Sequence, residues 1–440
     1  NSTIQGTGGQ LKATQTTTVN STPVNDAPIL DPSGFLTLTT ITEDDVNNSG
    51  NTIAAILASD GGTPNPITDV DNGAVEGIAI FGLTSGNGTW EYNTGSGWTA
   101  VGSVSVTESL LLRATDSLRF VPNGATGGTE VVTFAAWDQT TGTAGTKVDT
   151  SIFGGTTAFS DATDTAVLTV TSVNDLPIAD LNGADGGGIN FSTTFAEGDS
   201  PVAIADTDAT ITDPDHTTYE GLGINLGGFV DGADELIRVN GEQFVFAVSR
   251  VTTSTVGGTL FDLDFDGSGL TITKNGGGAV PEADLQALLR TVTYENTSQN
   301  PTGGNRTFNV IAQDASSLNA TPAAVSTVTV SAVHDDPVIT SDGGGASAAV
   351  NVAENSTAVT IVTSTDVDGG TAVYTITGGA DAAKFAVNSS TGVLTFVSAP
   401  DFETPTDAGS DNVYDVTVAV SDGAGGTDSQ VIAVTVTNVS

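Results

Sequence analysis

The stretch NVYDVTVAVSDGAGGTDSQVIAVTV, residues 412–436, decides the fold of this chain. Apolar residues alternate with polar ones on both sides of a glycine-rich segment. Side chains of a β-strand point alternately to opposite faces, so the pattern predicts two half-buried antiparallel strands joined by a loop. The same alternation runs through TAVLTVTSV at 165–173 and STVTVSAV at 326–333. Many short strands between turns of Gly, Asn, Asp and Ser predict an all-β chain of sandwiches.

A repeated motif follows these strands and divides the chain. It reads VNDAPIL at 24–30, VNDLPIA at 173–179 and VHDDPVI at 333–339. Proline ends ladder pairing, so each copy is interpreted as a linker between β domains. The predicted domains are 26–174, 175–334 and 335–440. Residues 1–25 are predicted to hold the last strand of a preceding or neighbouring domain, QLKATQTTTVNSTPV, followed by a linker.

One segment has the pattern of a helix. In PEADLQALLRTV, residues 281–292, a proline and an acid stand at the start, and Leu285, Leu288 and Leu289 share one face. We expect one short helix at an edge of the second sandwich.

Composition limits the function. The chain has 440 residues with 52 acids, 10 bases, a formal charge of −42 and no cysteine. Such a surface repels nucleic acid and anionic membranes, and it needs cations to relieve self-repulsion. The absence of cysteine removes disulfides and thiolate metal sites. No apolar run approaches the length of a transmembrane helix.

The acids recur in a fixed order in each predicted domain. An early glutamate comes first, then an Asp-x-Asp pair, and finally an aspartate after the penultimate strand, while each linker adds one aspartate. Ca²⁺ takes 6–8 oxygen ligands, and carboxylates one residue apart in a loop can converge on it. The candidate ligands are Glu43, Glu197 and Glu354; Asp69, Asp71, Asp213, Asp215, Asp366 and Asp368; Asp138, Asp314 and Asp422; and the linker residues Asp26, Asp175 and Asp335.

These motifs resemble a known family. VAENS, TDVDGG, GGADAAKFAVNSSTGVLTF and APDFETP, followed by VYDVTVAVSDGAGG, are similar in content and order to a bacterial cadherin-like domain. Segments such as GNGTWEYNTGSGWTAVG resemble the longer cadherin-like repeats of giant bacterial surface proteins. The resemblance implies three tandem Ig-like Greek-key β-sandwiches in an elongated rod, with calcium between successive domains.

The resemblance also implies which acids share an ion. At the second junction they are Glu197, Asp335, Asp366, Asp368 and Asp422, and at the first Glu43, Asp175, Asp213, Asp215 and Asp314. Asp401 and Glu403 match the family's mid-chain acidic motif in the third domain, and Glu295 or Asn296 is the counterpart in the second. Each linker has only one core aspartate, preceded by Asn25, Asn174 or His334, which departs from the family's fuller motif.

The predicted function is a secreted, calcium-stabilised structural or adhesive protein, either a rigid stalk or a repeating subunit of a surface filament. Neighbouring copies joined head to tail through the N-terminal strand are the expected partners. The alternative is a glycan- or surface-binding adhesin module that uses Trp90, Tyr92 and Trp98, although cross-strand packing is the commoner role of such rings. No enzyme is predicted, because the only two histidines, His216 and His334, lie beside candidate calcium ligands. DLDFDGSG at 262–269 lacks the twelfth-position glutamate of an EF-hand and is interpreted as a strand turning at Gly267.

Overall fold

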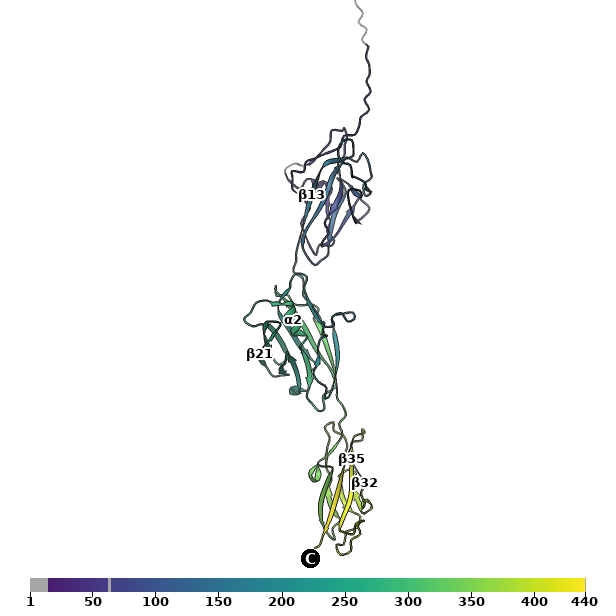
Figure 1. Ribbon diagram of the computed structural model, residues 1–440, viewed down its shortest axis with the longest axis vertical. Helices are drawn as coiled ribbons and strands as arrows, with labels where there is room; N and C mark the ends of the chain where they lie inside the picture. Colours follow the sequence, from purple (N-terminus) through teal and green to yellow (C-terminus); the bar gives the residue numbers. More distant parts are fainter. Residues whose placement is uncertain (1–14, 62–64, 440) are drawn as a thin grey trace, which may run out of the picture. The chain divides into compact units, whose positions relative to one another are not determined.

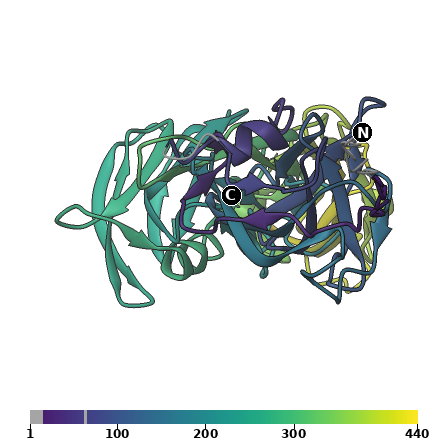
Figure 2. The same ribbon diagram turned by 90° about the horizontal axis from the view of Figure 1, so that it is seen from above.

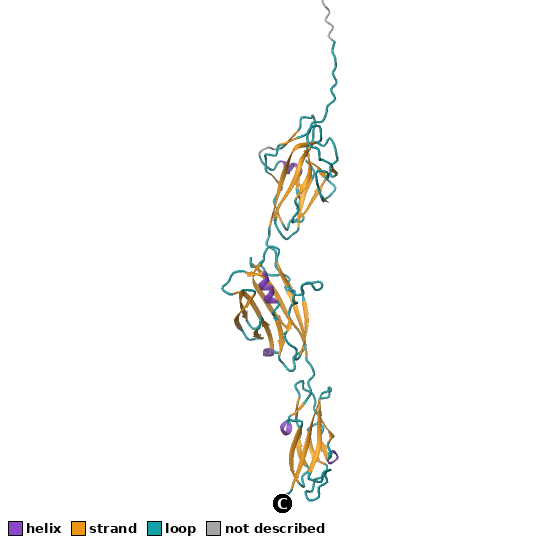
Figure 3. Ribbon diagram, viewed as in Figure 1, coloured by secondary structure: helices purple, strands orange, loops and turns teal. Residues whose placement is uncertain are grey.

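The computed structural model describes residues 15–61 and 65–439, and nearly all of its regular structure is β (Figure 3). The prediction of an all-β chain is therefore confirmed. Residues 1–175 and 176–440 contain two compact units, which are treated separately below. Residues 15–23 are exposed and belong to no strand, and the rest of the predicted N-terminal strand lies outside the described residues.

The first unit holds one sandwich, in which β13 is the longest strand (Figure 1). Its large sheet has the order β12-β9-β6-β11-β13-β2, with β3 also on β13, and its smaller sheet the order β4-β10-β7-β8, while β1 pairs with β5. The strands are β1 Ile29–Leu30, β2 Leu36–Thr37, β3 Ile41–Thr42, β4 Asn51–Thr52, β5 Ile67–Thr68, β6 Gly77–Leu83, β7 Gly88–Asn93, β8 Thr99–Ala100, β9 Ser109–Arg113, β10 Ser117–Pro122, β11 Gly128–Trp137, β12 Lys147–Val148 and β13 Phe159–Thr171.

The second unit begins with a larger sandwich, which includes α2 and β21 (Figures 1 and 2, teal to green). Its sheets have the orders β15-β27-β26-β18-β23-β22-β21, with β24 on β18, and β16-β25-β19-β20, and β14 pairs with β17. The elements are β14 Ile178–Asp180, β15 Phe191–Ala196, β16 Val202–Ala203, β17 Thr210–Thr212, β18 Thr218–Gly227, η1 Gly232–Asp234, β19 Glu235–Val239, β20 Glu242–Val245, β21 Arg250–Val256, β22 Thr259–Phe265, β23 Gly269–Lys274, β24 Val280–Pro281, α2 Glu282–Leu289, β25 Thr293–Asn296, β26 Gly304–Asp314 and β27 Ala324–Ser331.

The remainder of the second unit is a smaller sandwich that contains the opening stretch of the sequence. Its sheets have the orders β29-β36-β35-β32 and β30-β34-β33, and β28 pairs with β31. The elements are β28 Val338–Ile339, η2 Ser341–Gly343, β29 Ser347–Ala353, β30 Ala358–Ile361, β31 Ser364–Thr365, β32 Val373–Gly378, η3 Ala382–Lys384, β33 Phe385–Val387, β34 Val393–Phe396, β35 Val413–Ser421 and β36 Thr427–Thr437. The antiparallel β35–β36 hairpin is the one predicted from residues 412–436.

The three sandwiches share one wiring. In each, an early strand runs parallel to the last strand: β2 and β3 beside β13, β15 beside β27, and β29 beside β36. The last strand is antiparallel to β11, β26 or β35, which pairs in turn with β6, β18 or β32. The same strand ends therefore recur at the same places in every sandwich.

Two helices pack on these sheets. Leu285, Leu288 and Leu289 of α2 are buried in the core of the second sandwich, as the sequence predicts. The predicted helix of the second sandwich is therefore confirmed, and a single turn, α1 Ile53–Leu57, which the sequence pattern did not indicate, also forms in the first. The Thr52 side chain accepts a hydrogen bond from Ala55 N, which caps α1, and Ile53 anchors it in the core.

A buried ionic network crosses the second sandwich. The Arg306 guanidinium, 1% exposed, donates to Glu235 Oε1, to Asp231 Oδ2 at 3.0 Å and to the Thr302 carbonyl at 2.8 Å. The Tyr294 hydroxyl also donates to Glu235 Oε1, at 2.9 Å. Because each charged group has partners, the network satisfies the requirement that buried charges be paired.

Candidate metal centres

The Asp-x-Asp pair has the same local structure in all three sandwiches. The first aspartate, Asp69, Asp213 or Asp366, directly follows a short strand, β5, β17 or β31. Its Oδ1 accepts a hydrogen bond from the backbone N–H of the second aspartate, at 2.8 Å in the first two sandwiches and 2.9 Å in the third. This Asx turn fixes Oδ1 and leaves Oδ2 to face another partner.

The late aspartate also recurs in one geometry. Asp138 and Asp422 directly follow β11 and β35, and Asp314 is the last residue of β26; in the first sandwich the short strand β12 still separates β11 from the last strand, so the expected position after a penultimate strand holds only for the other two. Oδ1 of each accepts backbone N–H groups of the following loop, for example from Thr140 at 2.8 Å and from Ala424 at 2.7 Å. The Ala424 N–H is the main cause that lowers the pKa of Asp422, so this group is anionic at neutral pH.

The linker residue before the core aspartate contacts the late aspartate. In the first sandwich Asn25 Nδ2 donates to Asp138 Oδ2 at 2.9 Å, and in the third His334 Nε2 lies 2.8 Å from Asp422 Oδ2. The core aspartate is held by its backbone: Asp26 N donates to Asp71 Oδ2 at 2.9 Å, and Asp335 N to Asp368 Oδ2 at 2.6 Å. The linker is thus tied to the acids of the sandwich that follows it.

Each early glutamate accepts a hydrogen bond from the chain just after the last strand of its sandwich. Glu43, Glu197 and Glu354 each directly follow an early strand, β3, β15 or β29. Each accepts a hydrogen bond from the backbone N–H of a valine after the last strand: Val173 at 2.6 Å, Val333 at 3.1 Å and Val439 at 2.9 Å. The Val439 N–H, followed by that of Phe402, lowers the pKa of Glu354.

Within the second unit the predicted ligands meet in groups. Carboxylate oxygens of Glu197, Asp335 and Asp368 lie within 4.8 Å of one another, and so do those of Glu354, Asp401 and Glu403. A third group combines Asp213 and Asp314 with a nitrogen of His216, over the same range of distances. The predicted set that joins Glu43 and Asp175 to acids of the second unit spans both compact units and stays a prediction.

The first sandwich gathers its own acids around a cavity. A hollow of about 190 Å³ is lined by Asp69, Asp71, Glu76 and Asp138. The sequence reasoning missed Glu76, which accepts a hydrogen bond from the Asn65 side chain. Its only sequence signal is an acidic residue shortly after the Asp-x-Asp pair.

The proposed mid-chain counterpart in the second sandwich has other partners. Glu295 pairs with Arg238 at 2.5 Å, and Asn296 is buried and donates to Asp231 Oδ2 at 2.8 Å. Glu295 is therefore held in a partly exposed ion pair and Asn296 in the buried network, and neither joins the acidic groups described above.

Several of the predicted calcium ligands have a buried carboxylate oxygen without a hydrogen-bond donor. Glu43 Oε2, Asp69 Oδ2, Asp213 Oδ2, Asp335 Oδ2 and Asp366 Oδ2 are buried and accept no hydrogen bond. A buried carboxylate oxygen without a donor is costly unless a cation compensates it. Asp164 Oδ2, on β13, is also buried without a donor but lies outside the predicted sites, and burial raises the pKa of this group, so protonation can relieve it.

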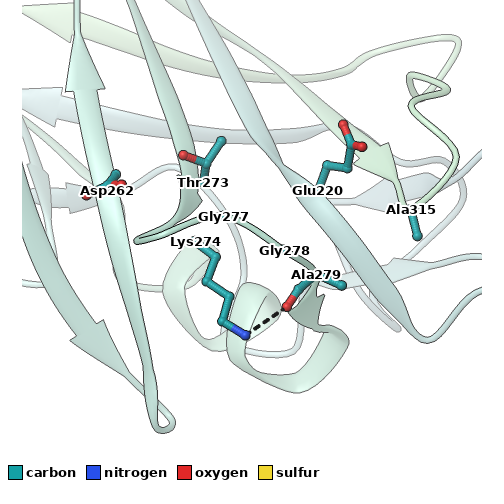
Figure 4. Close-up of a pocket in the computed structure, with 8 residues that line it drawn as sticks. All are labelled: Glu220, Asp262, Thr273, Lys274, Gly277, Gly278, Ala279 and Ala315. Carbon is teal, nitrogen blue, oxygen red and sulfur yellow. Dashed lines mark hydrogen bonds between the residues drawn. The ribbon is translucent and has the colours of Figure 1, made fainter.

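Two other surfaces are less suited to ligands. Trp90 is buried against Phe120, with ring centroids 5.1 Å apart, and Arg119 covers the Trp98 ring at 4.3 Å, so these rings do not form an open platform for sugar. Figure 4 shows a hollow of about 540 Å³ on the second sandwich, lined by Glu220, Asp262, Thr273 and Lys274 among others. Its lysine turns back to donate to the Ala279 carbonyl at 3.2 Å.

Asp262 lies on β22, and the chain turns after this strand at Gly267, which has a φ of 100°, so the strand interpretation of residues 262–269 is confirmed.

Comparison with known proteins agrees with this architecture. Residues 348–437, which lie within the third sandwich, match the family model of the cadherin domain. The wiring of this sandwich recurs in the other two, and the chain is built of cadherin-like tandem repeats. No curated protein matches the sequence. No helix in the described part of the chain is long and apolar enough to cross a membrane.

Cadherin repeats are among the solved structures that match this chain. They include EC21–23 of human CDH23, at 15% identity and a TM-score of 0.38, covering 93% of this chain and 99% of that one. EC22–24 of mouse cadherin-23 has 14% identity and a TM-score of 0.33, with 94% and 100% covered. Domains 1–4 of protocadherin gamma B7 have 11% identity and a TM-score of 0.32, with 95% and 75% covered.

Proposed function

We propose that this protein is an extracellular structural or adhesive repeat whose joints are stiffened by calcium. The supporting observation is the coincidence between the predicted ligands and the buried carboxylate oxygens that lack a hydrogen-bond donor. Cadherin-like repeats are adhesive and structural modules, and the charge of −42 adds a general demand for cations.

The donor set fits calcium. All of the proposed ligands offer hard oxygen atoms, and Ca²⁺ prefers 6–8 such ligands in flexible geometry. Asp366 and Asp368 would hold an ion from the third sandwich, with Asp335 from the linker and Glu197 from the sandwich before it. Val333 N donates a hydrogen bond to Glu197, and Asp335 N donates one to Asp368. An ion held by these carboxylates would therefore restrict the motion of the linker. When bound, the ion supplies charge compensation and cross-linking, while the hydrogen bonds of the chain supply the orientation.

Calcium titration of the purified chain tests the proposal. Millimolar calcium should raise the melting temperature relative to chelator and increase the maximum dimension seen by small-angle X-ray scattering. Extracellular calcium modules bind with a Kd on the order of 10⁻⁴–10⁻³ M, so the response should appear in that range. Equal melting temperatures and equal dimensions in calcium and in chelator would refute it.

A filament is the second candidate for the wider assembly. The segment QLKATQTTTVNSTPV alternates like the last strands of the sandwiches, and residues 15–23 belong to no strand of this chain. Such a segment can add to a sheet edge of another copy, and a head-to-tail contact of this type generates a filament. Deleting residues 1–22 and imaging the product tests this, since normal filaments from the shortened chain would rule out strand donation. Glycan binding remains the alternative for the first sandwich, to be tested on a glycan array.

A further inference from the structure

One acidic group in the second sandwich differs from the others because it contains a nitrogen. His216 follows the Asp-x-Asp pair directly, and one of its ring nitrogens lies within 4.8 Å of carboxylate oxygens of Asp213 and Asp314. His216 Nδ1 is 3.4 Å from Asp213 Oδ1. The Asx turn at Asp213 holds this arrangement, because Oδ1 accepts the backbone N–H of His216 as well as that of Asp215, at 2.9 and 2.8 Å.

Two atoms of the group are buried without a hydrogen bond. The Asp213 side chain is 0% exposed and its Oδ2 accepts no hydrogen bond, and His216 Nδ1 makes no hydrogen bond beyond its 3.4 Å contact with Asp213 Oδ1. The Asp314 side chain is fully buried as well, so two carboxylates lie close together away from water. Like charges at this distance repel strongly in a low dielectric, and a divalent cation would neutralise the pair.

The other ring nitrogen has a partner that suits metal binding at Nδ1. His216 Nε2 lies 3.4 Å from the Ser316 hydroxyl, on the loop that follows Asp314. If Nε2 carries the proton and donates to this hydroxyl, Nδ1 keeps a lone pair directed at the carboxylates. Metal-binding histidines are usually oriented by such a hydrogen bond from the second nitrogen.

We propose that His216, Asp213 and Asp314 form a site that prefers a divalent transition ion of the zinc type, whereas the oxygen-only sites prefer calcium. Imidazole suits zinc, whereas calcium takes oxygen ligands, so one nitrogen shifts the selectivity. One imidazole and two carboxylates leave a fourth position for water, and the site is neutral when a divalent ion is bound. Tetrahedral zinc with ligands at about 2.0–2.1 Å places donor atoms about 3.4 Å apart. The donor atoms lie within 4.8 Å of one another, so the widest such separation would need to close by up to about 1.4 Å.

His334 provides a matched control within the same chain. It is the only other histidine and also lies beside late and paired aspartates, with Nε2 2.8 Å from Asp422 Oδ2 and Nδ1 3.5 Å from Asp368 Oδ2. However, its side chain is 40% exposed, and its two nitrogens face different carboxylates instead of converging with them. We therefore expect that, of the two histidines, only His216 binds zinc.

The test is a titration of the full chain with zinc chloride after chelator treatment and desalting. Isothermal calorimetry should show one site that survives millimolar calcium, and Co²⁺ at the same site should give the intense visible bands of four-coordinate cobalt. His216→Asn should weaken zinc binding by more than about 10-fold and abolish these bands, because the nitrogen ligand is lost. His334→Asn should leave both unchanged. Comparing melting temperatures of the variants in chelator shows that the fold is intact, and His216→Gln serves as a second variant.

The outcomes are distinguishable. The proposal is overturned if both His216 variants bind zinc as tightly as the parent chain does. It is also overturned if His334→Asn loses as much zinc affinity as His216→Asn. The proposal shares Asp213 and Asp314 with the calcium sites but does not depend on calcium. If calcium changes neither stability nor shape while zinc binding follows His216, the calcium function fails and the zinc site stands.

Discussion

Replacing Asp366 by asparagine should change the stability of the third sandwich in opposite directions with and without calcium. The substitution keeps the shape of the side chain and the acceptor for Asp368 N, which is 2.9 Å from Oδ1. It removes the charge from Oδ2, which is buried and has no donor. In chelator the loss of an uncompensated charge should raise the melting temperature slightly, whereas in calcium the loss of an anionic ligand should lower it.

The size of the calcium effect follows from mass action. With a Kd of about 10⁻⁴ M and about 1 mM calcium, one site stabilises the folded state by about 1.4 kcal/mol. A domain of roughly 100 residues shifts its melting temperature by about 4–8 °C per kcal/mol, so losing the site should lower the transition of the third sandwich by about 6–11 °C.

Differential scanning calorimetry of the full chain resolves this, with the transition of the first sandwich as an internal reference that should not move. Asp342→Asn is the matched control, since Asp342 lies in the same sandwich and its carboxylate oxygens accept a hydrogen bond from Thr360 Oγ1, at 3.1 and 3.0 Å. Its φ of 50° is also tolerated by asparagine. A shift of the same sign for Asp366→Asn in calcium and in chelator would contradict a cation at this position.

Three further changes test the interior and the turns. Arg306→Met should destabilise the second sandwich by about 3–5 kcal/mol in urea unfolding because it leaves Glu235 buried and unpaired, and adding Glu235→Gln should recover part of the loss. Leu288→Ala, at a fully buried position of α2, should cost about 2–5 kcal/mol, and a loss near zero would mean that α2 does not contribute to the core. The pKa of Asp266 is lowered chiefly by the backbone N–H of Ser268, so its contribution to stability is present above the usual value of 3.8 and is lost as the pH falls through the lowered pKa. Asp266→Asn should therefore destabilise at neutral pH, and the difference from the parent chain in pH-dependent melting should vanish in strong acid.

The sequence predicted what depends on local pattern. Alternating residues gave the β35–β36 hairpin, and the apolar face of 281–292 gave α2. The Asp-x-Asp pairs were expected in loops, and the structure adds that Asp69, Asp213 and Asp366 each directly follow a short strand, where carboxylates commonly cap turns.

Features that depend on distant partners were not predictable. Arg306 and Glu235 are 71 residues apart, and nothing local to either indicates a buried pair. The burial of Trp90 depends on Phe120, its cross-strand neighbour on β10. The helix α1 has five residues, which is too short to show a helical period. The contact of His334 with Asp422 also joins a linker to a loop far along the chain, so the sequence showed that His334 lies beside the linker aspartate but not that it reaches Asp422.

The parallel pairing of early and last strands has a consequence for a chain under tension. Pulling the two ends of the third sandwich apart would load the β29–β36 ladder in shear, so that its seven paired positions, Ser347 to Ala353, resist together. The β15–β27 ladder of the second sandwich extends over six positions. In the first sandwich the parallel contact is split into two pieces of two residues each, at β2 and β3. The first sandwich therefore has the weakest mechanical clamp and is the one that should yield first, extending the chain while the other two stay folded.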